Sequence, residues 1–286
     1  MPTSSLRSSS RLCVAFVLAL LLLVGVIFAP ASQARTRNLV VFGDSVVADP
    51  PVGEYLARKV ERGSSNSTDG RFCPTSQSNF GVRAATKLGL QAADYSCSGA
   101  TATGTRSFFG GGQTIGVQVD RALADGALTP ATARVVVSNG FNDTYSNAGL
   151  PGEEVRARFV ASMAPQIGRI RAAAPNARIQ VVGYATIADG GYVCLFNAGG
   201  DLRDRTYAPQ VGQWEQLAQD MQRDLAAAAG VEFLDLKPST ADRGMCAPDH
   251  LRNWAGIVDV NASPQNLPFH MNARGHEHVA EVVARS

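Results

Sequence analysis

The chain has 286 residues, of which 45% are hydrophobic and 17% are charged, and its formal net charge is +2. This is the composition of an ordinary globular protein with enough apolar material for a sizeable core. Its 26 basic residues are balanced by 24 acidic ones and form no long run of like charge. The sequence therefore does not predict a nucleic-acid-binding protein.

An apolar run near the N-terminus predicts a segment that is not part of the fold. Two arginines precede the apolar residues 12–29, and the small residues Ser32 and Ala34 follow at the −3 and −1 positions of a cleavage site. This order is typical of a secretory signal peptide, so we expect residues 1–34 to be removed and residues 35–286 to form one exported catalytic domain. The alternative is a retained membrane anchor, because an apolar run of 18 residues lies at the lower limit for spanning a bilayer.

The rest of the chain alternates between strand and helix patterns. Short apolar runs predict buried strands, and apolar residues at three- and four-residue steps predict helices. In chain order, the predicted elements are a strand at 38–42, a helix around 54–60, a helix at 78–88 capped by Ser78, strands at 92–97 and 133–138, a helix at 151–174, a strand at 177–183, a helix at 208–229, a strand at 231–236 and a helix at 272–284 capped by Asn272. This alternation predicts an α/β fold, a three-layer α/β/α sandwich with a mostly parallel five-stranded sheet.

Chemically useful residues follow the predicted strands, where the functional groups of parallel α/β folds lie. Ser45 follows the first strand, Gly99 the second and Asn142 the third. His270 lies in the loop before the last helix, from which it can reach the end of the first strand. Because a serine hydroxyl attacks a carbonyl only when a base takes its proton, this pattern indicates nucleophilic catalysis with Ser45 and His270 as the pair.

These segments together resemble the four ordered sequence blocks of the SGNH (GDSL) hydrolases. The blocks are Phe42–Gly43–Asp44–Ser45, Ser98–Gly99, Gly140–Phe141–Asn142–Asp143, and His270 followed by Asn272 and Gly275. They cover almost the whole mature chain in the order of that family. The resemblance implies the flavodoxin-like fold of the family and a secreted serine esterase or lipase, similar to its secreted bacterial members.

The resemblance also assigns a role to each block. It implies that Ser45 is the nucleophile and His270 the base. It further implies that the oxyanion hole consists of the Ser45 N–H, the Gly99 N–H and the side-chain amide of Asn142. Such donors stabilise the charge that develops on the carbonyl oxygen.

The partner of the histidine departs from the usual family pattern. Many members carry an acid three residues before the histidine, and this chain has Leu267 there. We predict that the backbone carbonyl of Leu267 accepts the Nδ1 proton of His270 and fixes its tautomer, so that the site is a Ser–His dyad. The alternative is a full triad in which Asp249 or Asp259 supplies a carboxylate; both precede His270 in the late loop, the long loop before the last helix.

Four cysteines remain after signal removal, and an even number in an exported chain predicts two disulfides. Three connectivities are possible, and we favour the two local closures, Cys73–Cys97 and Cys194–Cys246. Free buried thiols are the alternative. A zinc site is not expected, because the chain has no C-x-x-C pair.

The expected chemistry requires no cofactor and no metal. The expected partner is a small-molecule or lipid ester, or an acylated polysaccharide, and the protein is expected to be an extracellular monomer. Two other functions share the same sequence features. One is a carbohydrate O-deacetylase, and the other is an exported binding protein that keeps the fold without activity.

Overall fold

The computed structural model describes residues 37–63, 73–104, 113–198 and 202–286. These residues belong to one structural unit that spans 36–286. The predicted signal segment at residues 1–34 lies outside the described residues. Within the described ranges, no helix has the length and apolar character needed to cross a membrane.

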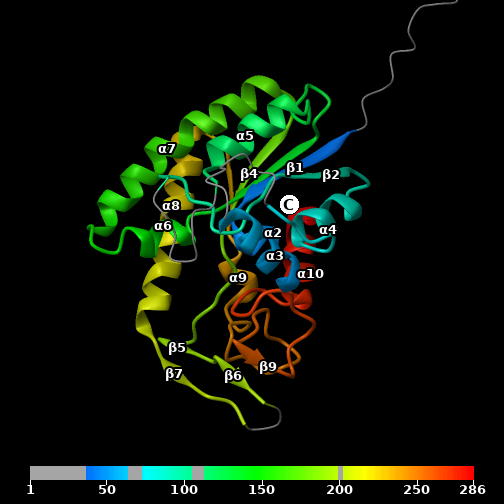
Figure 1. The fold of residues 1–286 in the computed structure, drawn as a ribbon. Coiled ribbons are helices and arrows are strands. Elements are labelled where there is room, and N and C mark those ends of the chain that lie inside the picture. Colours follow the sequence, from blue (N-terminus) through cyan, green and yellow to red (C-terminus); the bar gives the residue numbers. More distant parts are fainter. Residues whose placement is uncertain (1–36, 64–72, 105–112, 199–201) are drawn as a thin grey trace, which may run out of the picture. The chain divides into compact units, whose positions relative to one another are not determined.

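The centre of the unit is a five-stranded sheet in which neighbouring strands are all parallel, in the order β2-β1-β3-β4-β8 (Figure 1). The strands are β1 (Asn38–Gly43), β2 (Gln91–Asp94), β3 (Arg134–Ser138), β4 (Arg178–Val182) and β8 (Glu232–Leu234). The first residue of each observed strand lies within two residues of the first residue of a predicted strand. The predicted five-stranded α/β fold is therefore confirmed, and its parallel strands end at one common edge.

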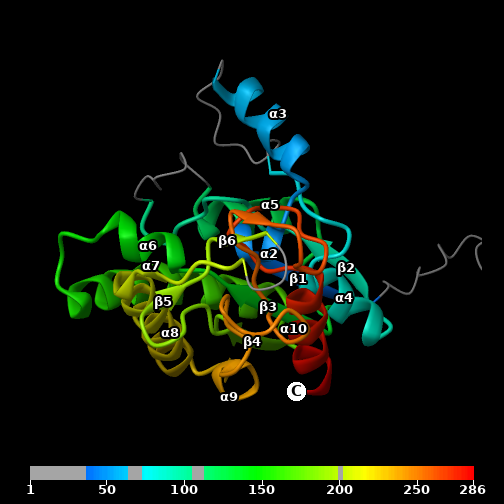
Figure 2. The ribbon, with the colours of Figure 1, turned by 90° about the horizontal axis from the view of Figure 1, so that it is seen from below.

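Helices cover both faces of this sheet (Figures 1 and 2). On one face lie α4 (Phe80–Lys87) and α10 (Ala273–Arg285). On the other face lie α5 (Ile115–Ala124), α7 (Gly152–Ala173) and α8 (Pro209–Ala229). Helix α10 is joined to the sheet by the Arg134 guanidinium, which donates to the Val283 carbonyl.

The core forms where the apolar sides of these helices meet the buried strands. Strand β3 is buried along its whole length, and all five of its residues lie within the predicted strand at 133–138. The residues of α7 that were predicted to share one side are all buried: Val155, Phe159, Met163, Ile167 and Ile170. Burial of such side chains contributes about 1.5–3 kcal/mol each, which explains why the 3.6-residue pattern determines these helices.

The predicted cap of α4 is wrong by one residue. The Asn79 side chain, and not that of Ser78, accepts the hydrogen bond from the Val82 N–H and begins the helix. Asn79 is buried and extended at this point, and its amide also donates to Asp94 at the end of β2. Asn79 therefore joins the helix to the sheet, a contact that propensity alone does not predict.

Several short elements lie at the edge where the strands end. Among the described residues, four helices lie there: α2 (Ser45–Ala48), α3 (Val52–Gly63), α6 (Phe141–Ser146) and α9 (Lys237–Thr240). Helix α3 contains the predicted helix around residues 54–60 and extends it at both ends. Two small sheets pair β5 (Tyr192–Val193) with β7 (Thr206–Tyr207) and β6 (Phe196–Asn197) with β9 (Val258–Asp259). Strand β9 belongs to the long loop before α10 that carries the histidine, so the second pair holds that loop.

Covalent and ionic links hold the loops at the same edge. The two expected disulfides, Cys73–Cys97 and Cys194–Cys246, are both formed. In the late loop, the buried Arg252 guanidinium pairs with the fully buried Asp259 carboxylate. Because removal of one partner from a buried ion pair leaves an uncompensated charge, this pair fixes the path of the loop.

Candidate active site

Ser45 lies where the chain leaves the sheet. Strand β1 ends at Gly43, and Ser45 is the first residue of α2. A Cβ atom at Gly43 would lie 2.5 Å from the Ser138 carbonyl oxygen and 2.3 Å from Val47, so only glycine fits this close approach. The Gln118 side chain bonds both backbone groups of Gly43, at 3.0 Å to its N–H and 2.8 Å to its carbonyl, and so fixes the turn.

The residue before the serine is a support of this turn. The Asp44 carboxylate caps α2 by accepting a hydrogen bond from the Val46 N–H, and its other oxygen accepts one from the Tyr184 hydroxyl at 2.5 Å. Burial raises the pKa of Asp44 to about 7, although both hydrogen bonds favour its ionised form. The Tyr184 oxygen in turn accepts a hydrogen bond from the Phe141 N–H, at the start of α6. One tyrosine therefore joins the loop of Ser45 to the loop of Asn142.

His270 meets Ser45 across the ends of the sheet. Its Nε2 lies 2.9 Å from the Ser45 Oγ, although the two residues are 225 positions apart. Its Nδ1 lies 2.9 Å from the Pro268 carbonyl oxygen. Because a carbonyl only accepts, Nδ1 carries the ring proton and Nε2 is free to accept the serine proton.

The predicted partner of the histidine was wrong by one residue. The Pro268 carbonyl, and not the Leu267 carbonyl, accepts the Nδ1 proton. Phe269 adopts a left-handed backbone conformation with φ 59°, which turns the chain and brings the carbonyl two residues before His270 to its own ring. Leu267 is buried instead.

The alternative acids of the late loop are bonded elsewhere. Asp249 accepts hydrogen bonds from Asn197, Arg203 and Arg252, and Asp259 pairs with Arg252. Both aspartates therefore serve the structure of the loop. The geometry is that of a dyad with a carbonyl oxygen behind the imidazole.

The two remaining site residues, Gly99 and Asn142, lie in the segments that follow β2 and β3. Gly99 is buried with φ 79°, a left-handed conformation that favours glycine. No backbone carbonyl among the described residues accepts a hydrogen bond from the Ser45 N–H or the Gly99 N–H. The buried Asn142 amide donates one hydrogen to the Ala100 carbonyl at 2.8 Å, and its oxygen accepts from the Tyr145 hydroxyl. Since an amide nitrogen has two hydrogens, a second one is left for a substrate.

The loop that follows Gly99 is held by a buried carboxylate. Asp143 accepts hydrogen bonds from the N–H groups of Ala102 and Thr103 and from the Thr103 hydroxyl. Burial raises the pKa of Asp143, and these hydrogen bonds oppose that effect. Asp143 therefore fixes the Gly99 loop relative to α6, so that both carry their donors in a set geometry.

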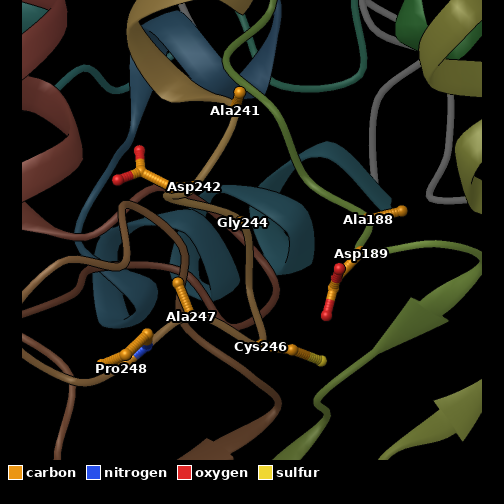
Figure 3. Close-up of a pocket in the computed structure, with 8 residues that line it drawn as sticks. All are labelled: Ala188, Asp189, Ala241, Asp242, Gly244, Cys246, Ala247 and Pro248. Carbon is orange, nitrogen blue, oxygen red and sulfur yellow. The ribbon is translucent and has the colours of Figure 1, made fainter.

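A pocket of about 230 Å³ lies on another part of the surface (Figure 3). Asp189 and Asp242 lie on opposite sides of it, and Cys246 of the second disulfide contributes to its wall. None of the proposed site residues lines it. Within the described part of the chain, no group of three or more potential metal ligands comes together.

Comparison with known proteins identifies relatives of this chain. The sequence matches a model of the GDSL-like lipase/acylhydrolase family over residues 41–278, a range that includes all four candidate site residues. A search of curated protein sequences finds no significant match.

Solved structures share the fold at low sequence identity. Phospholipase A1 from Streptomyces albidoflavus NA297 is 15% identical with a TM-score of 0.54, and the match covers 86% of this chain and 98% of that one. The extracellular lipase from Streptomyces rimosus is 19% identical with a TM-score of 0.54, covering 87% and 99%. A carbohydrate esterase family 2 enzyme with a carbohydrate-binding domain from Corynascus thermopiles is 16% identical with a TM-score of 0.50, covering 90% and 67%. These similarities establish a common fold.

Sequence reasoning missed the groups that support the site. Tyr184, two residues after β4, and Gln118 of α5 bond the Ser45 turn, and neither lies in a motif. The only available signal was position, because Tyr184 follows the predicted strand at 177–183. Supports of this kind are determined by tertiary contacts and leave no local pattern.

We predict that Tyr184→Phe lowers the free energy of unfolding by about 1–3 kcal/mol, because the buried Asp44 carboxylate and the Phe141 N–H each lose a partner. Urea unfolding at pH 7 measures this change. The matched control is Tyr207→Phe, whose ring is 67% exposed and which should change stability by less than about 0.5 kcal/mol. Equal unfolding midpoints for the two variants would contradict the proposed link.

Proposed function

Because the chain belongs to the GDSL-like lipase/acylhydrolase family and is a carboxylic ester hydrolase, we propose that Ser45 is its nucleophile and His270 its general base. The observation that carries this proposal is the 2.9 Å contact between the Ser45 Oγ and the His270 Nε2. That distance is within the range required for proton transfer between a nucleophile and its base.

The reaction begins with attack of the Ser45 Oγ on the ester carbonyl, while the His270 Nε2 takes the serine proton. The Ser45 N–H, the Gly99 N–H and the second amide hydrogen of Asn142 hold the oxyanion. His270 then gives its proton to the leaving alcohol, and an acyl group remains on Ser45. Water attacks this acyl-enzyme with His270 again as base, which restores the serine and releases the acid.

The state of His270 suits this role at neutral pH. Burial lowers its pKa below the ordinary value of 6.5, and the hydrogen bond to the Pro268 carbonyl opposes that shift. The imidazole is therefore neutral and able to accept a proton at pH 7, and activity should fall as the pH drops through the histidine pKa. The Pro268 carbonyl stabilises the imidazolium that forms during the reaction.

The direct test is hydrolysis of p-nitrophenyl butyrate by purified variants. Ser45→Ala and His270→Ala should each lower kcat/KM by more than about 1,000-fold, because the two side chains act as one unit. Asn142→Ala should lower it by about 100-fold or more through loss of one oxyanion donor. The control is His250→Ala, which changes an exposed histidine. Equal rates for all four variants would overturn the assignment, and an inactive wild-type protein would favour the binding-protein alternative.

We propose further that the enzyme is exported and acts outside the cell. The sequence pattern of residues 1–34 and the two disulfides support this proposal, since disulfides persist in oxidising compartments.

Among ester substrates, we propose lipid esters over acylated sugars. Helix α3 begins four residues after α2 ends, and it projects from the unit in Figure 2. Val52, Leu56 and Val60 recur at four-residue steps along it and are 45%, 55% and 78% exposed. An exposed apolar side on an amphipathic helix suits contact with a lipid aggregate. Its closeness in the chain to Ser45 would bring such a surface to the site.

Comparison of a tributyrin emulsion with dissolved p-nitrophenyl butyrate tests this preference. Leu56→Gln should lower the rate on the emulsion several-fold and leave the rate on the dissolved ester unchanged, because only the emulsion presents an apolar surface. Ala57→Gln, which places the same side chain about 100° around the helix, is the control. Equal effects on both substrates, or faster turnover of acetylated xylan than of tributyrin, would contradict the lipid preference.

A further inference from the structure

A buried carboxylate that the proposed mechanism does not use lies directly after the nucleophile helix. Asp49 is the C-cap residue of α2, with a left-handed backbone at φ 41°, and it is 3% exposed. Its Oδ1 is buried and has no hydrogen-bond partner among the described residues. Because a buried carboxylate oxygen without a partner is costly, its presence calls for a functional explanation.

Two side chains meet the other oxygen of this carboxylate. The Asn266 amide donates to the Asp49 Oδ2 and to the Asp49 backbone carbonyl, both at 2.9 Å. The same amide lies 3.3 Å from the Ser76 hydroxyl. Asn266 belongs to the loop that carries His270, so these contacts join the nucleophile helix to the loop of the base.

The second neighbour is His276 of α10. Its Nε2 lies 3.1 Å from the Asp49 Oδ2, and its Nδ1 accepts a hydrogen bond from the Phe80 N–H. Because Nδ1 accepts, the ring proton lies on Nε2, which makes no hydrogen bond with Asp49 or with any other described residue. The Asn266 amide therefore donates to the Asp49 carboxylate, and the His276 ring lies against the same oxygen.

From this arrangement we infer that Asp49 supplies the negative charge that the dyad lacks, as a positioning residue that holds the His270 loop through Asn266 and stabilises the imidazolium through space. The inference rests on the proposed function. Asp49 differs from the acid of a triad because it does not bond the imidazole, whose Nδ1 is occupied by the Pro268 carbonyl.

The charges around His270 support this role. Burial lowers the pKa of His270, the Pro268 carbonyl and the Asp49 carboxylate raise it, and His276 lowers it. Asp49 and His276 are the charged or titratable side chains of the described residues that act on this ring. A fixed negative charge nearby favours the protonated imidazole, which is the form that appears in the transition state.

The test is the pH dependence of kcat/KM for Asp49→Asn on p-nitrophenyl butyrate. Asparagine accepts the left-handed backbone and keeps an oxygen for the Asn266 amide, so the variant removes the charge with little else. The acid limb should move to lower pH by about 0.5–1 unit, and the plateau kcat should fall about 3- to 10-fold. NMR titration of the His270 ring in both proteins assigns the limb to that residue.

Asn266→Ala is the matched control, because it breaks the link between the two loops and keeps the Asp49 charge. It should lower stability and leave the position of the acid limb within about 0.2 unit of wild type, as expected for a change that removes no charge. If Asp49→Asn does not fold, Asp49→Gly replaces it, since glycine adopts the same backbone without strain.

An acid limb and a His270 titration that stay in place in the Asp49 variant would overturn the inference and leave Asp49 a structural residue. This result is distinct from failure of the proposed function. That function fails if Ser45→Ala retains wild-type activity, whereas the Asp49 inference is read from variants in a Ser45-dependent assay.

Discussion

The hydrogen bond between the Ser45 Oγ and the His270 Nε2 is the contact on which the proposed function depends. Its two residues come from opposite ends of the domain sequence, so it exists only if β1 and the late loop end at the same place. Parallel strand order satisfies this condition, because every strand of such a sheet delivers its following loop to one edge. The position of β1 between β2 and β3 places Ser45 beside the loops of Gly99 and Asn142.

In this site no carboxylate of the described residues bonds the histidine. A neutral backbone carbonyl bonds its ring, and a carboxylate acts on it only from a distance. The Pro268 carbonyl sets the tautomer, and the Asp49 carboxylate accepts a hydrogen bond from Asn266 and lies 3.1 Å from the His276 Nε2. The acids of the late loop are used by Arg203 and Arg252, which hold the loop in place. Orientation of the imidazole and stabilisation of its charge are therefore carried by different residues.

Much of the fold could be predicted from the sequence, because the helices and strands that form the core have clear periodicity. The placement of the four proposed site residues at one edge of the sheet could also be predicted, since each follows a strand or lies in the last loop. The helix at Ile115–Ala124 was missed, and the cap of α4 and the carbonyl behind His270 were each misplaced by one residue. The carbonyl behind His270 depends on one backbone angle at Phe269, and such an angle leaves no mark in composition.

The contacts that sequence reasoning could not find are those between distant positions. Tyr184 with Asp44 and His276 with Asp49 each join two segments that carry no shared pattern. Both pairs are buried, and both involve a carboxylate whose burial must be compensated by a specific partner. Prediction of these pairs requires the tertiary structure, because only the fold brings the partners together.

The central claim is that Ser45 is an activated nucleophile. Mass spectrometry of the oxidised, folded protein after reaction with a fluorophosphonate tests it most directly. The account predicts one phosphonyl adduct, on the peptide that contains Ser45, and none on protein unfolded before reaction. An unlabelled Ser45 in the folded protein, or equal labelling of the unfolded chain, would contradict it.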